Sequence, residues 1–375
     1  MRVEFFRHEL GAAEEAAVRE VFGTIFLTTA EKNSDFERLL AEYLGVQDTV
    51  TVSSCTAALH LALIALGIGP GDEVVTTPLS FVATANAVLL AGATPVFVDV
   101  DPATGLLDLD LVKDAITPAT RAILPVHLYG GMVDMVSLRQ IADAHGLVVI
   151  EDAAHALEAS RDGIRPGNLG EAACFSFYPT KSITCGEGGA LATNSEELAG
   201  RVRRLRNHGM TKGAADRHTA RYEHWDIELL GWKYNLTNFQ AAMLIPQLAH
   251  VEERRRRRAE ICALYEERLR PHSVSFPDMD GEIDGHARHL FTVWAEARRR
   301  DDILLGLQDA GIGVGVHYRP IHLTTYYRKR FGHKPGSYPA AERIGASTFS
   351  LPLYPSLRAE EVEHVAEIVI RTLAS

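Results

Sequence analysis

The stretch LVVIEDAAHALEA, residues 147–159, decides the fold class of this chain. It begins with an apolar run, ends that run with Glu151 and Asp152, and continues through small residues to His155. A short run that is apolar on both faces is typical of a buried strand in a mostly parallel sheet. Ligands of such sheets gather at the carboxyl ends of the strands, so Asp152 could face a ligand. Alternatively, Asp152 caps the next helix.

The segments around this strand repeat its pattern. Between Asp48 and Thr193, short apolar runs alternate with segments whose apolar residues follow helical spacing, which is typical of an α/β fold. The expected strands are 49–52, 73–77, 95–99, 122–127, 147–151, 173–177 and 189–193. The expected helices are 56–66, 82–90, 108–116 and 135–145, the last capped by Asp134.

The pattern changes after Asn207 and predicts a second, smaller domain. Residues 209–226 are polar and without periodicity, which predicts a long loop. Residues 237–269 predict a helix bent or interrupted near Pro246, because an interior proline removes a hydrogen-bond donor. Strands are expected at 290–295 and 313–318, and helices at 302–310 and 359–373. We therefore expect a large domain over 1–248 and a small α/β domain over 249–375.

Composition excludes several classes of protein. The chain has 375 residues, 46% of them apolar and 23% charged, which is ordinary for a globular protein. Its net charge of −11 has the wrong sign for nucleic-acid binding through the overall field. The four cysteines lack CxxC spacing and the 16 histidines lack supported pairs, so we expect neither a metal site nor a disulfide framework. Without a signal-peptide pattern or a membrane-length apolar run, we expect a cytoplasmic protein that makes no membrane contact.

A lysine stands in the segment CFSFYPTKSITCGEGGA, residues 174–190. The expected strand 173–177 ends in small and aromatic residues. It leads into a glycine-rich loop that contains Lys181. An amine forms a Schiff base only when part of it is deprotonated, which partial burial favours by lowering its pKa. The alternative is a surface lysine in a glycine turn.

A third segment, SSCTAALHLAL at residues 53–63, carries a strand end directly into a helix. Exposed amides and the helix dipole make such a start suitable for phosphate, with Ser54 and Thr56 as further donors. Taken alone, these residues could simply cap the helix. Together the three segments supply a phosphate cradle, an acid for a ring nitrogen and a lysine for an aldehyde, which pyridoxal phosphate requires.

With these motifs the chain resembles the DegT/DnrJ/StrS family of pyridoxal-phosphate-dependent nucleotide-sugar aminotransferases. The matching motifs occur in the family's order: SSCTAALHLAL, SFVATANAVLLAGATPVFVDVD, VHLYGG, EDAAHALEA, FSFYPTKSITCGEGG, RNHGM, GWKYNLTNFQAAM, VHYRPIHL and SLPLYPSL. The resemblance implies the aspartate-aminotransferase fold, fold type I, with a seven-stranded mostly parallel sheet and a smaller C-terminal α/β domain. It also implies a homodimer whose active sites are each built from both subunits.

The resemblance assigns roles to individual residues. Lys181 matches the lysine that forms the aldimine with the cofactor and then carries protons, and Asp152 matches the partner of the pyridinium nitrogen. Phe81 matches the aromatic against the cofactor ring, and His155 matches the residue near the ring hydroxyl. The family's phosphate contacts are matched by Cys55, Thr56 and Ser176. Asn235 matches the residue that reaches the phosphate of the neighbouring subunit's cofactor. Cys55 departs from the small residue, often glycine, that usually stands there, although a backbone contact would survive the change.

The resemblance implies a ping-pong reaction. L-Glutamate would convert the cofactor to pyridoxamine phosphate, and a nucleoside-diphosphate-linked 4-keto-(6-deoxy) sugar would then accept the amino group, with Lys181 as acid and base. Dehydrating relatives carry histidine in place of Lys181. His155 resembles the 4-keto-sugar enzymes, whereas 3-keto enzymes often have glutamine there. The alternatives are a 3-keto-sugar aminotransferase and a non-catalytic regulatory protein of this fold.

Further polar residues are expected to contact substrate or solvent. Contacts to the sugar or nucleotide are expected from His208, His317, Tyr318 and His322. No arginine is assigned to the glutamate carboxylate. The run Arg254–Arg258 would point all the way round a helix, which favours a solvated helix over a nucleic-acid site.

Overall fold

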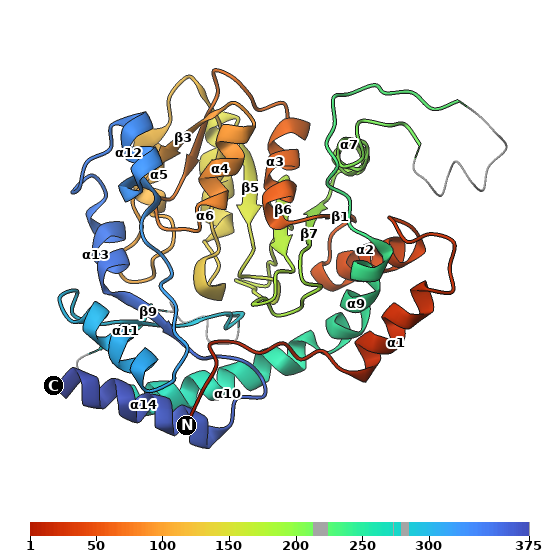
Figure 1. Ribbon diagram of the computed structural model, residues 1–375. Coiled ribbons are helices and arrows are strands. Elements are labelled where there is room, and N and C mark those ends of the chain that lie inside the picture. The colour runs from red at the N-terminus through yellow and green to blue at the C-terminus, as the bar shows by residue number, and fades with distance from the viewer. Residues whose placement is uncertain (213–223, 273, 279–284, 375) are drawn as a thin grey trace.

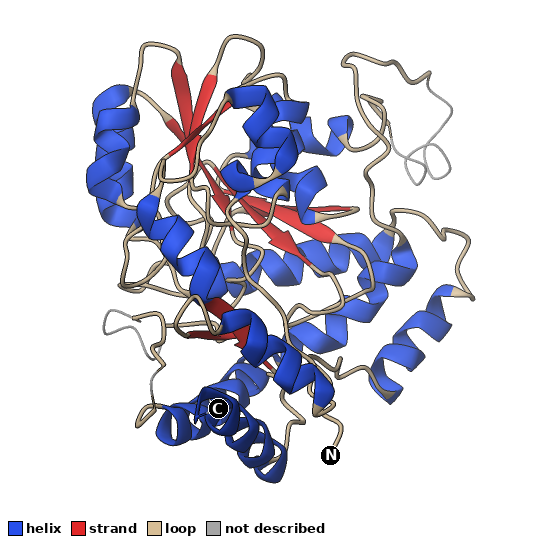
Figure 2. Cartoon of the chain, turned by 60° about the vertical axis from the view of Figure 1, so that its left-hand side comes forward, coloured by secondary structure: helices blue, strands red, loops and turns tan. Residues whose placement is uncertain are grey.

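A seven-stranded sheet forms the centre of the molecule (Figures 1 and 2). The computed structural model describes residues 1–212, 224–272, 274–278 and 285–374. The strand order is β1-β7-β6-β5-β4-β2-β3, and β7 alone runs antiparallel to its neighbours in the sheet. The strands are β1 (Asp48–Val52), β2 (Glu73–Thr76), β3 (Thr94–Phe97), β4 (Thr120–Leu124), β5 (Val148–Asp152), β6 (Ala172–Ser176) and β7 (Gly189–Thr193). This confirms the predicted fold class and all seven predicted strands.

Helices cover both faces of this sheet because its strands are apolar on both faces. Successive residues alternate between two buried clusters: Val74 packs into one and Val75 into the other. One layer contains α3 (Cys55–Ala65), α4 (Ala83–Leu90) and α7 (Glu196–Leu205). The opposite layer contains α2 (Glu31–Leu44), α5 (Leu109–Ala115), α6 (Met135–His145) and α9 (Asn238–Ala249). Helix α1 (Ala12–Val21) packs against α9. Asp134 caps α6 as predicted, accepting a bond from Ser137 N at 2.9 Å.

The C-terminal part has its own apolar cluster, which lies below the sheet in Figure 1. Its elements are α10 (Val251–Leu269), β8 (Phe291–Trp294), α11 (Arg300–Asp309), β9 (Thr348–Leu351) and α14 (Ala359–Ala374). Val3, from the N-terminus, also packs into this cluster. Helices α12 (Thr325–Phe331) and α13 (Pro339–Ser347) and two short 3₁₀ turns, Leu128–Gly130 and Ile321–Leu323, complete the described elements. The domain boundary at 248/249 falls in the last turn of α9 and stays a prediction.

One expectation for the C-terminal part needs correction. The strand predicted at 313–318 was wrong: Gly315 makes a single bridge to Ser350, and β8 pairs instead with β9, antiparallel. Glycine weakens a strand, and two glycines interrupt this segment. The interruption predicted near Pro246 in the helical segment 237–269 is confirmed: it lies at His250, four residues beyond Pro246, which is itself inside α9. Helix α9 packs against α1 and α2.

The long loop predicted at 209–226 falls mostly on residues 213–223, which lie outside the described residues. Among the described residues, no helix is both long and apolar enough to cross a membrane.

Candidate active site

Side chains from several loops meet beyond the carboxyl ends of the parallel strands. Asp152 ends β5, Lys181 follows β6, and Cys55 begins the helix that follows β1. The Sγ atom of Cys55 lies 4.0 Å from Asp152 Oδ1, and Nζ of Lys181 lies 3.5 Å from Nε2 of His289. A small pocket of about 30 Å³ opens beside Lys181 and is also lined by Ser182, Arg258 and His289. The structure therefore brings together the acid, the lysine and the helix start that the sequence predicted separately.

Asp152 is held in one orientation by short contacts. Oγ1 of Thr84 donates to Oδ2 at 2.7 Å, and the N–H of Ala154 donates to Oδ1 at 3.2 Å. Burial raises the pKa of Asp152 above its ordinary value, although these hydrogen bonds and the charge of Lys181 oppose the rise. A buried carboxylate so placed gains strongly from a cationic group facing it, such as a protonated ring nitrogen.

Lys181 is suited to act as a nucleophile. Burial lowers the pKa of its amino group to about 8, while the charge of Asp152 opposes the change. A sizeable fraction of the amine is therefore neutral near physiological pH, which is the form that attacks a carbonyl. The surface-lysine alternative does not describe this position, because the side chain lies in the pocket and its Nζ faces His289.

His155 joins the sheet edge to the C-terminal part. Its Nδ1 accepts a bond from Tyr129 N at 3.3 Å, and its Nε2 lies 3.1 Å from the hydroxyl of Tyr318. Burial and the nearby charge of Lys181 lower the pKa of His155 well below its ordinary value. Because Nδ1 of this neutral ring is the acceptor, Nε2 carries the proton and donates to Tyr318. Phe81, which is 58% exposed, has its ring centroid 6.0 Å from that of Tyr318.

The start of α3 can receive an anionic group. Ser54 caps the helix by accepting from Ala57 N at 3.1 Å, and the first-turn amides of Cys55 and Thr56 have no acceptor within the helix. The backbone of β7 passes closely here, because a Cβ atom on Gly189 would lie only 2.4 Å from the carbonyl carbon of Ser54. Cys55 itself is buried, and burial raises the pKa of its thiol well above the ordinary value. The thiol is therefore neutral.

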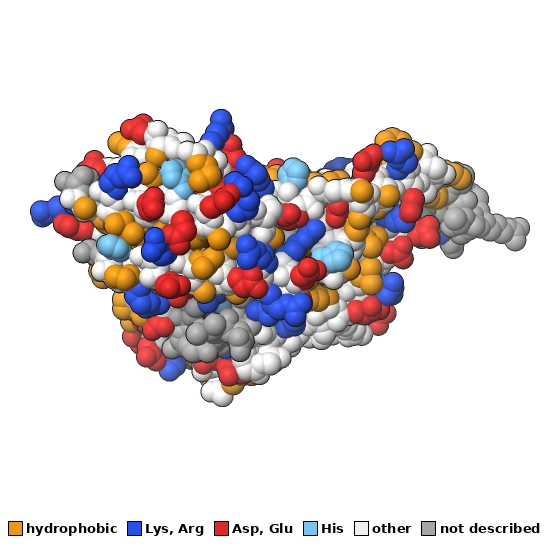
Figure 3. Space-filling model, turned by 90° about the horizontal axis from the view of Figure 1, so that it is seen from below, with side chains coloured by type: hydrophobic (Ala, Val, Ile, Leu, Met, Phe, Trp, Pro, Cys, Tyr) orange, Lys and Arg blue, Asp and Glu red, His pale blue; other side chains and the backbone are white. Residues whose placement is uncertain are grey.

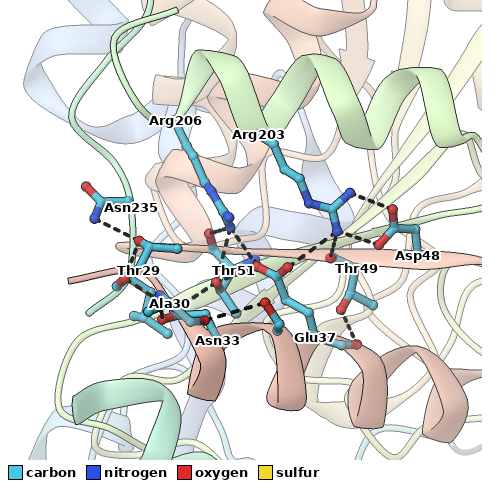
Figure 4. Close-up of polar contacts among 12 residues, drawn as sticks. Thr29, Ala30, Asn33, Glu37, Asp48, Thr49, Thr51, Arg203, Arg206 and Asn235 are labelled. Atoms are coloured by element: carbon cyan, nitrogen blue, oxygen red, sulfur yellow. Dashed lines mark hydrogen bonds and ion pairs between the residues drawn. The ribbon is translucent and has the colours of Figure 1, made fainter. Parts of the chain in front are cut away.

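The other two residues predicted to contact phosphate are Ser176 and Asn235. Ser176 is the last residue of β6, the strand that precedes Lys181, and its Oγ accepts a bond from Tyr178 N at 3.4 Å. Asn235 lies at the margin of a polar network on α2, β1 and α7 (Figure 4). Its Nδ2 donates to Thr28 Oγ1 at 3.1 Å and to Thr29 Oγ1 at 2.9 Å. Within one subunit its amide is thus directed to residues 28–29.

The network beside Asn235 is anchored by a buried acid (Figure 4). Glu37 accepts from Arg206 Nη1 at 2.6 Å and from Arg203 Nη2 at 3.3 Å. Burial alone would raise the pKa of Glu37, but the charges of the two arginines outweigh it and lower the pKa. The network ties α2 and α7 to the strand that leads into α3.

The four residues predicted to contact substrate are not all in one place. Tyr318 lies beside His155. Nδ1 of His317 lies 2.9 Å from Ser350 Oγ, and burial lowers the pKa of His317 to about 4. His322 is buried elsewhere, with Nε2 at 2.9 Å from Glu342. His208 is exposed in a turn and adopts a positive φ of 62°.

Three residues of the site were missed from the sequence. Thr84 orients Asp152, Tyr129 fixes the ring of His155, and His289 faces Lys181. Thr84 stands three residues after Phe81 in the motif SFVATANA, so its motif was visible but its contact was not. His289 directly precedes the strand predicted at 290–295, and its sequence neighbourhood carries no signal of a contact with Lys181.

The arginine run also requires a correction. Arg258 is not solvated: it is 4% exposed and pairs with Glu158. Its neighbours behave as predicted, for example Arg257, which pairs with the exposed Glu260. Seen from below in Figure 3, the side on which α10 and α14 lie in Figure 1, basic side chains are interspersed with acidic ones.

The described groups fit pyridoxal phosphate. The fit rests on a buried carboxylate for the ring nitrogen, an amine with a lowered pKa for the aldehyde, and a closely approached helix start for the phosphate. The half-exposed ring of Phe81 supplies a flat apolar surface at the same site. A regulatory protein would need none of these in combination.

Comparison with known proteins agrees with this geometry. The profile of the DegT/DnrJ/EryC1/StrS aminotransferase family matches residues 8–370, and the chain belongs to this family. Spore coat polysaccharide biosynthesis protein SpsC of Bacillus subtilis (strain 168) is 40% identical, with 96% of this chain and 94% of that protein covered. The chain is therefore a pyridoxal-phosphate-dependent sugar aminotransferase, as the resemblance predicted.

Solved structures share the whole fold. DesV of S. venezuelae, in complex with a ketimine intermediate, is 37% identical with a TM-score of 0.92, and 100% of this chain and 99% of that chain are covered. The putative sugar aminotransferase Spr1654 of Streptococcus pneumoniae, in its PMP form, is 30% identical with a TM-score of 0.93 and the same coverage. Spr1654 has also been solved in PLP and apo forms.

Proposed function

We propose that this enzyme transfers the amino group of L-glutamate to a nucleoside-diphosphate-linked 4-keto-6-deoxy sugar, giving a 4-amino sugar. The observation that carries this choice is His155, which is buried and donates to Tyr318. The family resemblance associates histidine at this position with 4-keto sugars. The glutamate donor also rests on the resemblance.

Each residue of the site has a task in this proposal. When bound, pyridoxal phosphate supplies an electron sink for the carbon that loses or gains a proton. Asp152 would face the ring nitrogen and keep it protonated, and Thr84 holds the carboxylate in one orientation for that role. Lys181, with a pKa of about 8, can release and recover a proton at Nζ near neutral pH.

Phosphate and ring contacts complete the proposed cofactor site. The first-turn amides of Cys55 and Thr56, with the hydroxyl of Ser176, would receive the phosphate. Phe81 would cover the face of the ring. Because the thiol of Cys55 stays neutral, its presence adds no negative charge beside the phosphate.

We also propose a homodimer in which Asn235 reaches the partner's cofactor. Residues 28–29, which hold Asn235, follow a segment with three exposed apolar side chains. Phe22 is 73% exposed, Ile25 is 78% exposed and Leu27 is 50% exposed. Neighbouring exposed apolar side chains mark an interaction surface, and a second copy of the chain would cover them.

Absorbance spectra of the purified enzyme test the donor and the acceptor in turn. L-Glutamate should replace the visible cofactor band by that of the pyridoxamine form, and a nucleotide 4-keto-6-deoxy sugar should restore it. NMR of the product then locates the new amino group. An amino group on carbon 3, or no response to glutamate, would overturn the proposal.

A pair of lysine variants serves as a control for this assay. Lys181→Ala should abolish both spectral changes and leave the thermal unfolding midpoint nearly unchanged. Lys113→Ala, at an exposed lysine near Asp110, should behave as the wild type. Turnover retained by Lys181→Ala would contradict the assigned role.

A further inference from the structure

A buried ion pair connects α10 to the loop after β5. The side chain of Arg258 is 5% exposed and that of Glu158 is 0% exposed, and Nη2 lies 2.5 Å from Oε1. Buried ion pairs contribute little net stability, because the loss of hydration offsets most of the attraction. Their clearer effect is to fix groups in one arrangement, so the question is which groups this pair fixes.

The guanidinium of Arg258 holds the chain that leads to His289. Its Nε donates to the carbonyl oxygen of Arg288 at 2.9 Å, and its Nη2 donates to that of Ala287 at 3.0 Å. The next residue is His289, whose Nε2 lies 3.5 Å from Lys181 Nζ. One planar side chain thus fixes the two peptide groups directly before the histidine that faces the reactive amine.

Glu158 holds the loop that carries Lys181. Its second oxygen, Oε2, accepts from Ser182 Oγ at 3.0 Å. Ser182 directly follows Lys181, so the loop that carries the lysine and the segment that carries His289 are tied to one ion pair. Lys181, Ser182, Arg258 and His289 all line the same pocket.

His289 is neutral in this arrangement. Burial lowers the pKa of its ring well below the ordinary value, and positive charge nearby lowers it further. The groups that face it are Lys181, Arg258, His317, His286 and His155. A neutral ring can accept a hydrogen bond from Lys181, whereas a protonated ring would repel the ammonium form.

We propose that Arg258 and Glu158 are positioning residues that hold His289 Nε2 as the hydrogen-bond acceptor of Lys181 Nζ and keep the lysine loop in the pocket. The inference rests on Lys181 being the reacting lysine of the proposed function. It does not depend on the identity of the sugar or the donor.

The test measures Lys181 itself, in the full chain after removal of the cofactor. Acetic anhydride modifies only neutral amines, and mass spectrometry of the peptide containing Lys181 gives the rate against pH. The wild type should show a midpoint near pH 8, the pKa that burial gives Lys181. A wrong assignment of substrate would leave this profile unaffected, so the two proposals fail separately.

Ser182→Ala and Arg258→Lys should both raise the midpoint. Each variant weakens the contacts that hold the loop of Lys181. The lysine then becomes more exposed to solvent and loses part of the burial that lowers its pKa. We expect modification at pH 7 to slow by about tenfold, which corresponds to a rise of about one pKa unit. Arg256→Lys, at an exposed position of the same helix, should leave the profile unchanged.

His289→Phe should shift the midpoint in the opposite direction. Phenylalanine preserves the buried ring but removes the acceptor that favours the ammonium form, so the pKa of Lys181 should fall below 8. In the holoenzyme, Ser182→Ala should lower kcat and leave the KM for glutamate unchanged.

These outcomes decide the proposal. Unchanged profiles in Ser182→Ala and Arg258→Lys, both with wild-type circular dichroism, would overturn the positioning role. A His289→Phe profile that matches the wild type would overturn the acceptor role. If Arg258→Lys fails to fold, Ser182→Ala, which leaves the ion pair in place, still decides the first point.

Discussion

Asp152 and Lys181 are buried groups of opposite charge, and each changes the protonation of the other. Burial lowers the pKa of Lys181 to about 8, and the charge of Asp152 opposes that change. Burial raises the pKa of Asp152, and the charge of Lys181 is among the influences that oppose the rise. The activity of the lysine therefore depends on the acid even before a cofactor binds.

Asp152→Asn should lower the pKa of Lys181 below 8. The variant removes a negative charge that favours the ammonium form, so the neutral amine should appear at lower pH. The pH profile of Lys181 acetylation in the cofactor-free chain measures the change, with exposed Asp162→Asn as the matched control. In the holoenzyme, kcat should fall by about 10²-fold or more, because the ring nitrogen loses its counter-ion. An unmoved midpoint would show that the two groups are not coupled.

Site residues that follow the end of a strand can be predicted from the sequence. Residues that reach the site only through tertiary packing cannot. Asp152, Lys181 and Cys55 each follow a strand whose end could be placed from its apolar run. The contact between His289 and Lys181 joins residues 108 positions apart and depends on how α10 and β8 pack against the sheet. Periodicity carries no information on that packing, which also explains why the burial of Arg258 was not predicted.

At the scale of elements, β7 and α3 meet at a point where only glycine fits. A Cβ atom at Gly189 would lie 2.5 Å from the N atom of Cys55 and 2.7 Å from the carbonyl oxygen of Phe175. Backbone atoms on both sides cannot rotate away as a flexible side chain would. The start of α3, which is the proposed phosphate site, therefore depends on the first residue of β7.

Gly189→Ala should destabilise the protein by about 1–3 kcal/mol, because the added methyl group overpacks two backbone segments. It should also weaken cofactor binding by displacing the start of α3. Urea unfolding and cofactor titration measure the two effects. Gly200→Ala is the matched control: its Cβ would meet nothing within 4 Å in α7, so we expect a gain of about 0.5–1 kcal/mol. Equal stability of the two variants would contradict the packing argument.

Elements with strong local signals were predicted closely. Strand β7 and helix α6 match their predicted ranges, and the cap of α6 was identified from Asp134. The segment 313–318 was mistaken for a strand because its apolar residues alternate, as they do in a strand. Its neighbours decide otherwise, since β8 forms its ladder with β9. Alternation identifies a segment that can pair, whereas the partner is chosen by tertiary packing.

At the scale of the whole molecule, polar contacts near Lys181 join the C-terminal part to the part that contains the seven-stranded sheet. Arg258 on α10 reaches Glu158 beyond β5, and Tyr318 reaches His155. Tyr129 also donates to the carbonyl oxygen of His317 at 2.6 Å. The C-terminal part is thus held against the sheet by the same residues that surround Lys181, so a shift between the two parts would alter the site directly.

A shared active site predicts that two inactive variants restore one another. Lys181→Ala lacks the reacting amine, and Asn235→Ala lacks the amide that the proposed homodimer places in its partner's site. If each site combines Lys181 of one subunit with Asn235 of the other, a mixed dimer contains one intact site. Random exchange of equal amounts should then restore about a quarter of wild-type activity, because half of the dimers are mixed and each has one working site.

The measurement is turnover after co-refolding the two variants, compared with each variant refolded alone. Lys181→Ala mixed with Lys181→Arg is the matched control, since neither subunit supplies a lysine and no activity should return. Activity in the mixture of Lys181→Ala and Asn235→Ala that merely equals the sum of the separate variants would place Asn235 in its own subunit's site or outside any site. Recovery would show that the exposed apolar segment around Phe22 and Ile25 lies where two copies meet, since residues 28–29, which hold Asn235, continue from it.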